Sequence, residues 1–193
     1  MKSRNAGSVL YEVEVHDKDG NLIKRVIKEG DSILGNWINL FMAIRAGQEY
    51  NFQDTGGTNA YVSSLAFTNC GMLAPAGDDS YGILVGTGTT EVSMNDYALA
   101  NKIPHGTGSG QLSYGETSSY NELNDPQWDI GLQRSFDNNS GADITINEIG
   151  MVMKISDGSS TYYVMIARDV ISATTVPNGG RVTVKYWFRW NPS

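Results

Sequence analysis

Close to the C-terminus, an apolar residue occupies every second position of the chain. These apolar residues are Val182, Val184, Tyr186, Phe188 and Trp190. A period of two is typical of a β-strand with one buried face. We therefore expect a strand that runs nearly to the chain end and turns its apolar face toward a core. Trp187 falls on the opposite face, where we expect it to meet a neighbouring subunit or a covering loop.

The same alternation recurs along the chain and makes strands the dominant element. It covers residues 9–15, which lead through an Asp-Gly turn into residues 22–28, and it returns over residues 128–136. Within residues 144–155 the phase changes at Glu148, which predicts a bulge or a strand buried on both faces. About nine strands, not alternating with helices, predict a mainly β fold: an antiparallel β-sandwich of the jelly-roll type.

Residues 32–46 follow a helical period instead. Apolar residues recur there at spacings of three and four, at Leu34, Trp37, Ile38, Phe41 and Ile44. This spacing predicts one amphipathic helix of about four turns near the N-terminus. Its wide apolar face can pack on a sheet of its own chain or on a neighbouring subunit. The first four of these residues, together with Trp187, are therefore candidate interface residues.

A polar segment at residues 48–60, rich in Gly, Asn and Thr, is the best candidate for a boundary. We expect it to be a loop between a hairpin and helix at residues 1–47 and a β-sandwich at residues 61–193. A chain of 193 residues fits one domain. The N-terminal part should then pack on the sandwich or on a neighbouring subunit.

Charge and composition exclude several classes of protein. The formal net charge is −7 and the sequence pI is about 4.7. This balance argues against binding to nucleic acid, which needs a basic face, and against docking on anionic membranes. The start of the chain lacks the apolar stretch of a signal peptide, and no apolar run approaches the roughly 18 residues of a membrane span. We therefore expect a protein made in the cytoplasm.

Several phrases of the sequence then stand out in a fixed order. They are YEVEVHDKDGNLIKRVIKEGDSILGN (residues 11–36), VGTGTTEVSMNDYALANKI (85–103), HGTGSGQLSYG (105–115), FDNNSGADITINEIGMVMK (136–154), IARDVI (166–171) and TVPNGGRVTVKYWFRW (175–190). Together they resemble a family of virion structural proteins of tailed bacterial viruses and their relatives, over most of the chain. None of the phrases is a catalytic motif, so the resemblance implies an assembly role and transfers no functional residues.

The resemblance implies a non-enzymatic protein located in the virion, without a cofactor. We expect a capsid-associated subunit, such as a decoration, cement or minor capsid protein, that contacts itself and other virion proteins such as the major capsid protein. Closed cyclic symmetry is usual for homo-oligomers, and we take a trimer as the working expectation. Two alternatives stay open: a tail, neck or baseplate component, and a carbohydrate-binding receptor-recognition module that uses exposed aromatic residues.

Residues 137–148 contain part of the pattern of a calcium-binding loop. The candidate ligands are Asp137, Asn139, Asp143 and Glu148. Gly141 fills a ligand position without a side chain, and the flanking residues have the pattern of strands rather than helices. A solvated hairpin turn is therefore favoured over calcium, and we expect no bound metal.

Overall fold

The computed structural model describes residues 7–30, 33–46, 50–62, 70–124, 127–156 and 159–190. This part of the chain is mainly β, with antiparallel sheets and little helix. Its elements are β1 (Gly7–His16), β2 (Leu22–Glu29), α1 (Gly35–Ala46), β3 (Tyr50–Gln53), β4 (Asn59–Val62), β5 (Gly82–Gly86), β6 (Ser113–Asn124), β7 (Gln127–Asp137), β8 (Ile144–Ser156), β9 (Thr161–Val176) and β10 (Arg181–Trp190). No helix among these residues has the length and apolar character needed to cross a membrane.

A five-stranded antiparallel sheet joins the two ends of the described chain. Its order is β2-β1-β10-β7-β6, so β1 pairs with its hairpin partner on one side and with β10 on the other. The strand expected at the C-terminus is confirmed as β10. It lies in the centre of this sheet, where Val184 pairs with Val13 of β1 and with Arg134 of β7.

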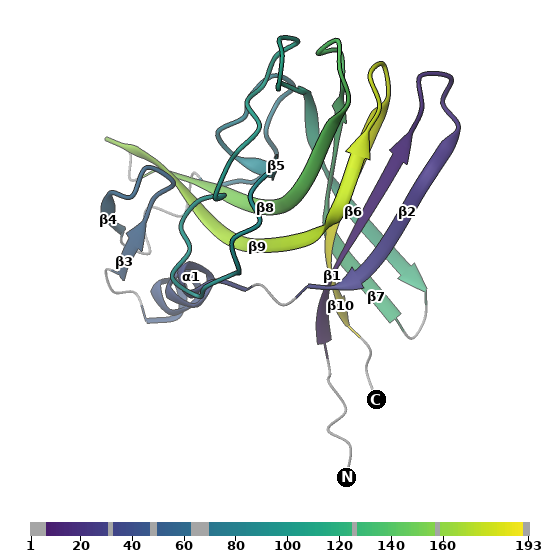
Figure 1. Cartoon of the computed structure of the whole chain (residues 1–193). Coiled ribbons are helices and arrows are strands. Elements are labelled where there is room, and N and C mark those ends of the chain that lie inside the picture. The colour runs from purple at the N-terminus through teal and green to yellow at the C-terminus, as the bar shows by residue number, and fades with distance from the viewer. Residues whose placement is uncertain are drawn as a thin grey trace.

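A second antiparallel sheet consists of β5, β8 and β9, and its long curved strands cross the first sheet (Figure 1). The phase change expected at Glu148 is confirmed as a register shift between Ile146 and Glu148, where β8 pairs with β9. Apolar side chains of both sheets form one buried cluster. It includes Tyr11, Val13, Val184 and Phe136 of the first sheet and Ile83, Ile149, Val152 and Met165 of the second.

The β1–β2, β7–β8 and β9–β10 turns gather at one end of the molecule, while β1 begins and β10 ends at the opposite end (Figure 1). The turns contact each other: the backbone N–H of Asn138 donates to Gly180 O at 2.9 Å, and Gly179 N donates to Asn138 O at 2.7 Å. These bonds tie the β7–β8 turn to the β9–β10 turn.

Helix α1 packs through a face that differs from the expected one. Among the helix side chains that the structure describes, the buried ones are Asn36, Leu40 and Ala43, at spacings of four and three. Trp37 and Ile38, which the apolar spacing places on the buried face, are 38% and 48% exposed. Their own chain therefore leaves both side chains partly uncovered, and their burial against a neighbouring subunit stays a prediction.

The cause is a polar anchor on the helix. The Asn36 side-chain amide donates to the backbone carbonyls of Gln53 in β3 (3.0 Å) and Met165 in β9 (3.2 Å). An amide that is satisfied in this way can occupy a buried position, and it turns the neighbouring Trp37 outward. Leu34 lies just before the helix and is fully buried, as expected, whereas the side chain of Phe41 lies outside the described part of the structure.

The segment at residues 48–60, expected to be a loop, contains β3 and the start of β4, which form a two-stranded hairpin. Phe52 pairs with Ala60 across it, and both are buried in a small cluster that includes Leu40 of α1. Two apolar residues in so polar a segment are too few to produce a strand pattern in the sequence.

Candidate functional site

The inner face of the five-stranded sheet is covered over only part of its length. On β10, Tyr186 is buried, but Phe188 and Trp190 on the same face are 43% and 46% exposed. Ile130 and Trp128 pair with them on β7 and are 49% and 45% exposed. The second sheet therefore stops covering this face between Tyr186 and Phe188.

We call the uncovered part the open sheet end. Its residues are Val9, Leu123, Trp128, Ile130, Phe188 and Trp190. The rings of Phe188 and Trp190 stack with their centroids 6.5 Å apart, and Trp128 Nε1 donates to Asn121 Oδ1 at 2.7 Å. These contacts hold large aromatic surfaces in a fixed arrangement that faces solvent.

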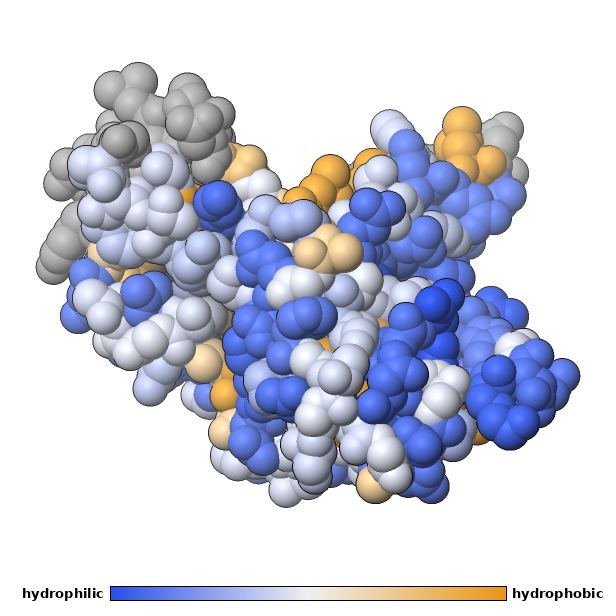
Figure 2. Space-filling view, turned by 90° about the horizontal axis from the view of Figure 1, so that it is seen from above, coloured by the Kyte–Doolittle hydropathy of each residue, from blue (hydrophilic) through white to orange (hydrophobic). Residues whose placement is uncertain are grey.

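The open sheet end continues into a groove of about 580 Å³. Ile33 and Trp37, beside and on α1, form its opposite wall with Met72 and Leu73. Figure 2 shows this region as a notch with hydrophobic residues at its base, between two protruding parts of the surface. Because the described residues that line it are nearly all apolar, the groove can hold an apolar segment.

The candidate interface residues are divided between this groove and the interior. Trp37 lines the groove, Ile38 is exposed beside it on α1, and Leu34 lies in the core. Trp187 is only 5% exposed, because its own chain covers it: its ring lies 6.0 Å from that of Tyr120 and 5.8 Å from the guanidinium of Arg189. These contacts of its own chain cover most of the Trp187 ring, and the residue also borders the groove.

The candidate calcium ligands are kept apart. Asp137 pairs with Arg181 at 2.6 Å, Asp143 accepts a hydrogen bond from the backbone N–H of Asn178 at 2.9 Å, and Asn139 is exposed. Glu148 lies in the interior. Among the described residues, no group of three or more His, Cys, Asp or Glu side chains could hold a metal ion.

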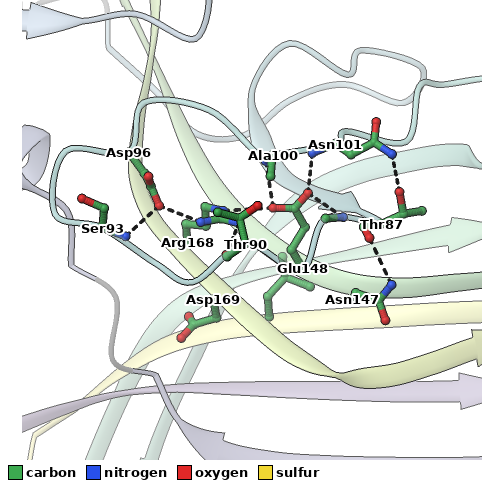
Figure 3. Close-up of polar contacts among 12 residues, drawn as sticks. Thr87, Thr90, Ser93, Asp96, Ala100, Asn101, Asn147, Glu148, Arg168 and Asp169 are labelled. Atoms are coloured by element: carbon green, nitrogen blue, oxygen red, sulfur yellow. Dashed lines mark hydrogen bonds and ion pairs between the residues drawn. The ribbon is translucent and has the colours of Figure 1, made fainter.

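Glu148 instead anchors a long loop at residues 87–101 (Figure 3). One carboxylate oxygen accepts the backbone N–H groups of Gly88 (3.0 Å) and Asn101 (2.7 Å), and the other accepts that of Ala100 (2.9 Å). This second oxygen also pairs with Arg168 Nε at 2.9 Å. Each oxygen of the buried Glu148 carboxylate therefore accepts from two donors.

Arg168 extends the network to the middle of the loop. Its Nη1 pairs with Asp96 at 2.6 Å and its Nη2 donates to Thr90 O at 2.8 Å. Burial acts to lower the pKa of Arg168, but hydrogen bonds to Asp96 and Glu148 outweigh it and raise the pKa above its ordinary value. The loop is therefore held from inside by a permanent cation.

Arg134 is a second buried cation, and it lies on the apolar face of the alternating stretch at residues 128–136. Its guanidinium donates to five backbone carbonyls, among them Gly115 O (2.8 Å), Tyr81 O (3.0 Å) and Ile83 O (3.1 Å). Burial lowers its pKa. The signal in the sequence was an arginine at a core position of β7, between Leu132 and Phe136.

The chain was compared with protein-family models, with curated proteins and with solved structures, and none of the three comparisons found a significant match.

Proposed function

We propose that the chain is a non-enzymatic structural subunit of a virion, with a β-sandwich of the jelly-roll type, and that a second copy of the chain covers its open sheet end. The observation that carries the proposal is the uncovered apolar face at Ile130, Phe188 and Trp190. Two antiparallel sheets that share one core support the sandwich. The resemblance to virion proteins supports the location, with a capsid-associated position favoured over the tail.

The size of the apolar surface supports a stable contact. Trp37, Trp128, Phe188 and Trp190 are each 38–46% exposed, which leaves roughly 100 Å² of each aromatic side chain in solvent. With the neighbouring aliphatic residues, the surface exceeds the roughly 300–600 Å² of the largest apolar patch on a typical monomer. It approaches the roughly 800 Å² that each partner contributes to a standard interface.

A second copy is the occupant that these residues suit best. The same surface holds a groove and, beside it, a protruding helix face with Ile38 and Met42 exposed. A surface with both shapes can pair with its own copy about a symmetry axis. Few charged side chains lie at the open sheet end, so repulsion between copies is small.

Sedimentation of two lysine variants tests the contact. Ile130→Lys puts a charge into the open sheet end, whereas Ile27→Lys puts the same charge on β2, at an isoleucine of nearly equal exposure (49% and 50%). We expect the wild type and Ile27→Lys to sediment as oligomers and Ile130→Lys as a monomer. A monomeric wild type up to about 100 µM would contradict self-association, because standard interfaces reach micromolar affinity or better.

The virion location is tested separately. Density-gradient-purified particles should contain the chain in many copies, detected by quantitative peptide mass spectrometry against the major capsid protein. If the wild type is monomeric alone but co-sediments with particles, and Ile130→Lys does not, another virion protein covers the open sheet end. Absence from purified particles would refute the proposed location.

A further inference from the structure

A second concave site lies on the other side of α1, away from the groove. Its volume is about 210 Å³, and it is lined by α1, the β3–β4 hairpin and the loop at residues 94–96. Six side-chain amides line it: Asn36, Asn39, Asn51, Gln53, Asn59 and Asn95. Amides both donate and accept hydrogen bonds, as hydroxyl groups do.

Three of these amides are fixed in position. Asn36 bonds to the backbone of β3 and β9, Asn39 Nδ2 donates to Asn51 O at 3.0 Å, and Gln53 Nε2 donates to Gly57 O at 3.1 Å. Each of these bonds uses an amide nitrogen. For Asn39 and Gln53 this leaves the amide oxygen as an oriented acceptor.

The other three amides have their hydrogen-bonding groups available. Within the described residues, the side chains of Asn51, Asn59 and Asn95 form no hydrogen bond, and all three are exposed. The amide of Asn36 is fully used, since its oxygen also accepts from the backbone N–H of Gln53 at 3.4 Å. The oxygens of Asn39 and Gln53 are thus two oriented acceptors beside three adaptable amides. This combination suits a ligand with several hydroxyl groups on a rigid ring.

The charges around the site favour a neutral ligand. Its charged lining residue is Asp96, whose Oδ2 already accepts from Arg168 (2.6 Å) and from the backbone N–H of Ser93 (3.0 Å) (Figure 3). Arg168 is buried behind Asp96 and points to Glu148 and Thr90. The described lining therefore has no cation to attract a carboxylate, sulfate or phosphate group.

The volume of the pocket and its fixed walls suit a single sugar ring. At roughly 30 Å³ per water molecule, the site holds about seven waters, which is room for a single ring but not for an extended peptide. The ion pairs of Arg168 hold the wall that carries Asn95. Tyr97, 39% exposed, lies against Gly57 of the β3–β4 turn and so joins this loop to the hairpin that forms another wall.

We propose that this amide-lined pocket binds a single residue of a neutral saccharide. The proposal does not depend on self-association or on the virion location, since the pocket and the open sheet end share no lining residue.

The test is an NMR titration of the ¹⁵N-labelled full chain with methyl glycosides of glucose, galactose, mannose and N-acetylglucosamine. With at least one of them, the side-chain NH₂ signals of Asn51, Asn59 and Asn95 should shift in a saturable way. The dissociation constant should be on the order of 1 mM, the usual scale for a ligand of about a dozen atoms. The methyl glycoside of glucuronic acid should bind at least tenfold more weakly than that of glucose.

Variants locate the site. Asn59→Ala combined with Asn95→Ala should weaken binding at least tenfold, and Asn139→Ala, at an exposed asparagine in the distant β7–β8 turn, should leave it unchanged. If the double variant does not fold, the wild-type signals that shift during the titration locate the binding site instead. The proposal is overturned if no neutral glycoside gives saturable shifts at these amides, or if an acetylated dipeptide amide binds as tightly as the best sugar.

Discussion

The Glu148 carboxylate and the Arg168 guanidinium form an ion pair in the interior, with Oε2 2.9 Å from Nε and neither side chain more than 2% exposed. The two residues lie on the paired strands β8 and β9, two positions apart in the register. A buried ion pair is strongly destabilised when one partner is lost, because the remaining charge has no compensation. The pair therefore makes the loop at residues 87–101 depend on the sheet beneath it.

Glu148→Gln should lower the free energy of unfolding by about 3–5 kcal/mol. The amide removes the charge next to Arg168 and presents an NH₂ group to backbone N–H donors that need an acceptor. Urea unfolding measures the loss. Glu91→Gln, an exposed carboxylate in the same loop, is the control and should change stability by less than about 0.5 kcal/mol. Equal losses in the two variants would show that the pair is not an anchor.

Asp79 should give the protein a pH-dependent contribution to stability. Partial burial acts to raise the pKa of Asp79, but the backbone N–H of His105 (2.8 Å) and the Lys102 cation (3.2 Å) outweigh it and hold the pKa below 3.8. A pKa that is lower in the folded state stabilises the fold above the unfolded value and loses that effect as pH falls through the folded value. The contribution is therefore complete above about pH 5 and is lost progressively as pH falls below that, through the unfolded and then the folded pKa.

Urea unfolding of the wild type and Asp79→Asn from neutral pH to about pH 2 measures this contribution. The stability difference between them should be constant above about pH 5 and shrink progressively at lower pH. Lys102→Met, which removes the nearby cation, should raise the pKa of the Asp79 carboxyl in an NMR titration. A carboxyl that titrates at or above 3.8 in the wild type would be inconsistent with this reading.

Metal chelation should leave the fold intact. Asp137 is paired with Arg181 and Glu148 with Arg168, and Asp143 accepts from the backbone of Asn178, so each carboxylate already has a partner. We expect EDTA to shift Tm by less than about 1 °C. A fall of many degrees, reversed by added calcium, would show that the β7–β8 turn holds an ion.

The strands could be predicted where one face is buried along a continuous stretch. β10 and the phase change at Glu148 follow from side-chain alternation, which is a local property of the sequence. The partners of buried charges are not local: Arg134 binds carbonyls of Tyr81 and Ile83, about fifty positions earlier in the chain. Such partners are set by how the two sheets pack, and no spacing pattern encodes them.

The point at which the second sheet stops covering the first could not be predicted from the sequence either. Tyr186 and Phe188 occupy equivalent positions in the alternation, yet one is buried under the second sheet and the other lies beyond its edge. For a related reason, the polar residue on the packed face of α1 could not be predicted. Asn36 is polar but fully bonded, so the buried face includes a residue that hydrophobic periodicity assigns to solvent.

Leu34 and Trp37 should separate folding from assembly. Leu34→Ala should cost about 2–5 kcal/mol of stability, because Leu34 is fully buried and its truncation leaves a cavity. Trp37→Ala should cost less, since Trp37 is 38% exposed and lines the groove. Sedimentation should rank the two variants in the opposite order. Trp37→Ala should dissociate the oligomer at concentrations where folded Leu34→Ala remains associated. A larger stability loss for Trp37→Ala would place that side chain in a closed core.

Trp187 and Phe188 make the sharpest comparison, because they are consecutive residues on opposite faces of β10. Trp187 is covered by Tyr120 and Arg189 of its own chain, so Trp187→Ala should cost about 3–5 kcal/mol in urea unfolding and leave self-association unchanged. Phe188 is 43% exposed at the open sheet end. Phe188→Ala should therefore change stability by less than about 1 kcal/mol and weaken self-association at least tenfold.

Both variants are measured at the same protein concentrations by urea unfolding and by sedimentation. Unfolding is followed below the dissociation concentration, so that loss of the oligomer does not register as loss of fold stability. If Phe188→Ala costs as much folding stability as Trp187→Ala and leaves the oligomer intact, Phe188 is held by its own chain. The copies would then have to meet through another surface, and α1, with Ile38 and Met42 exposed, would be the next to test.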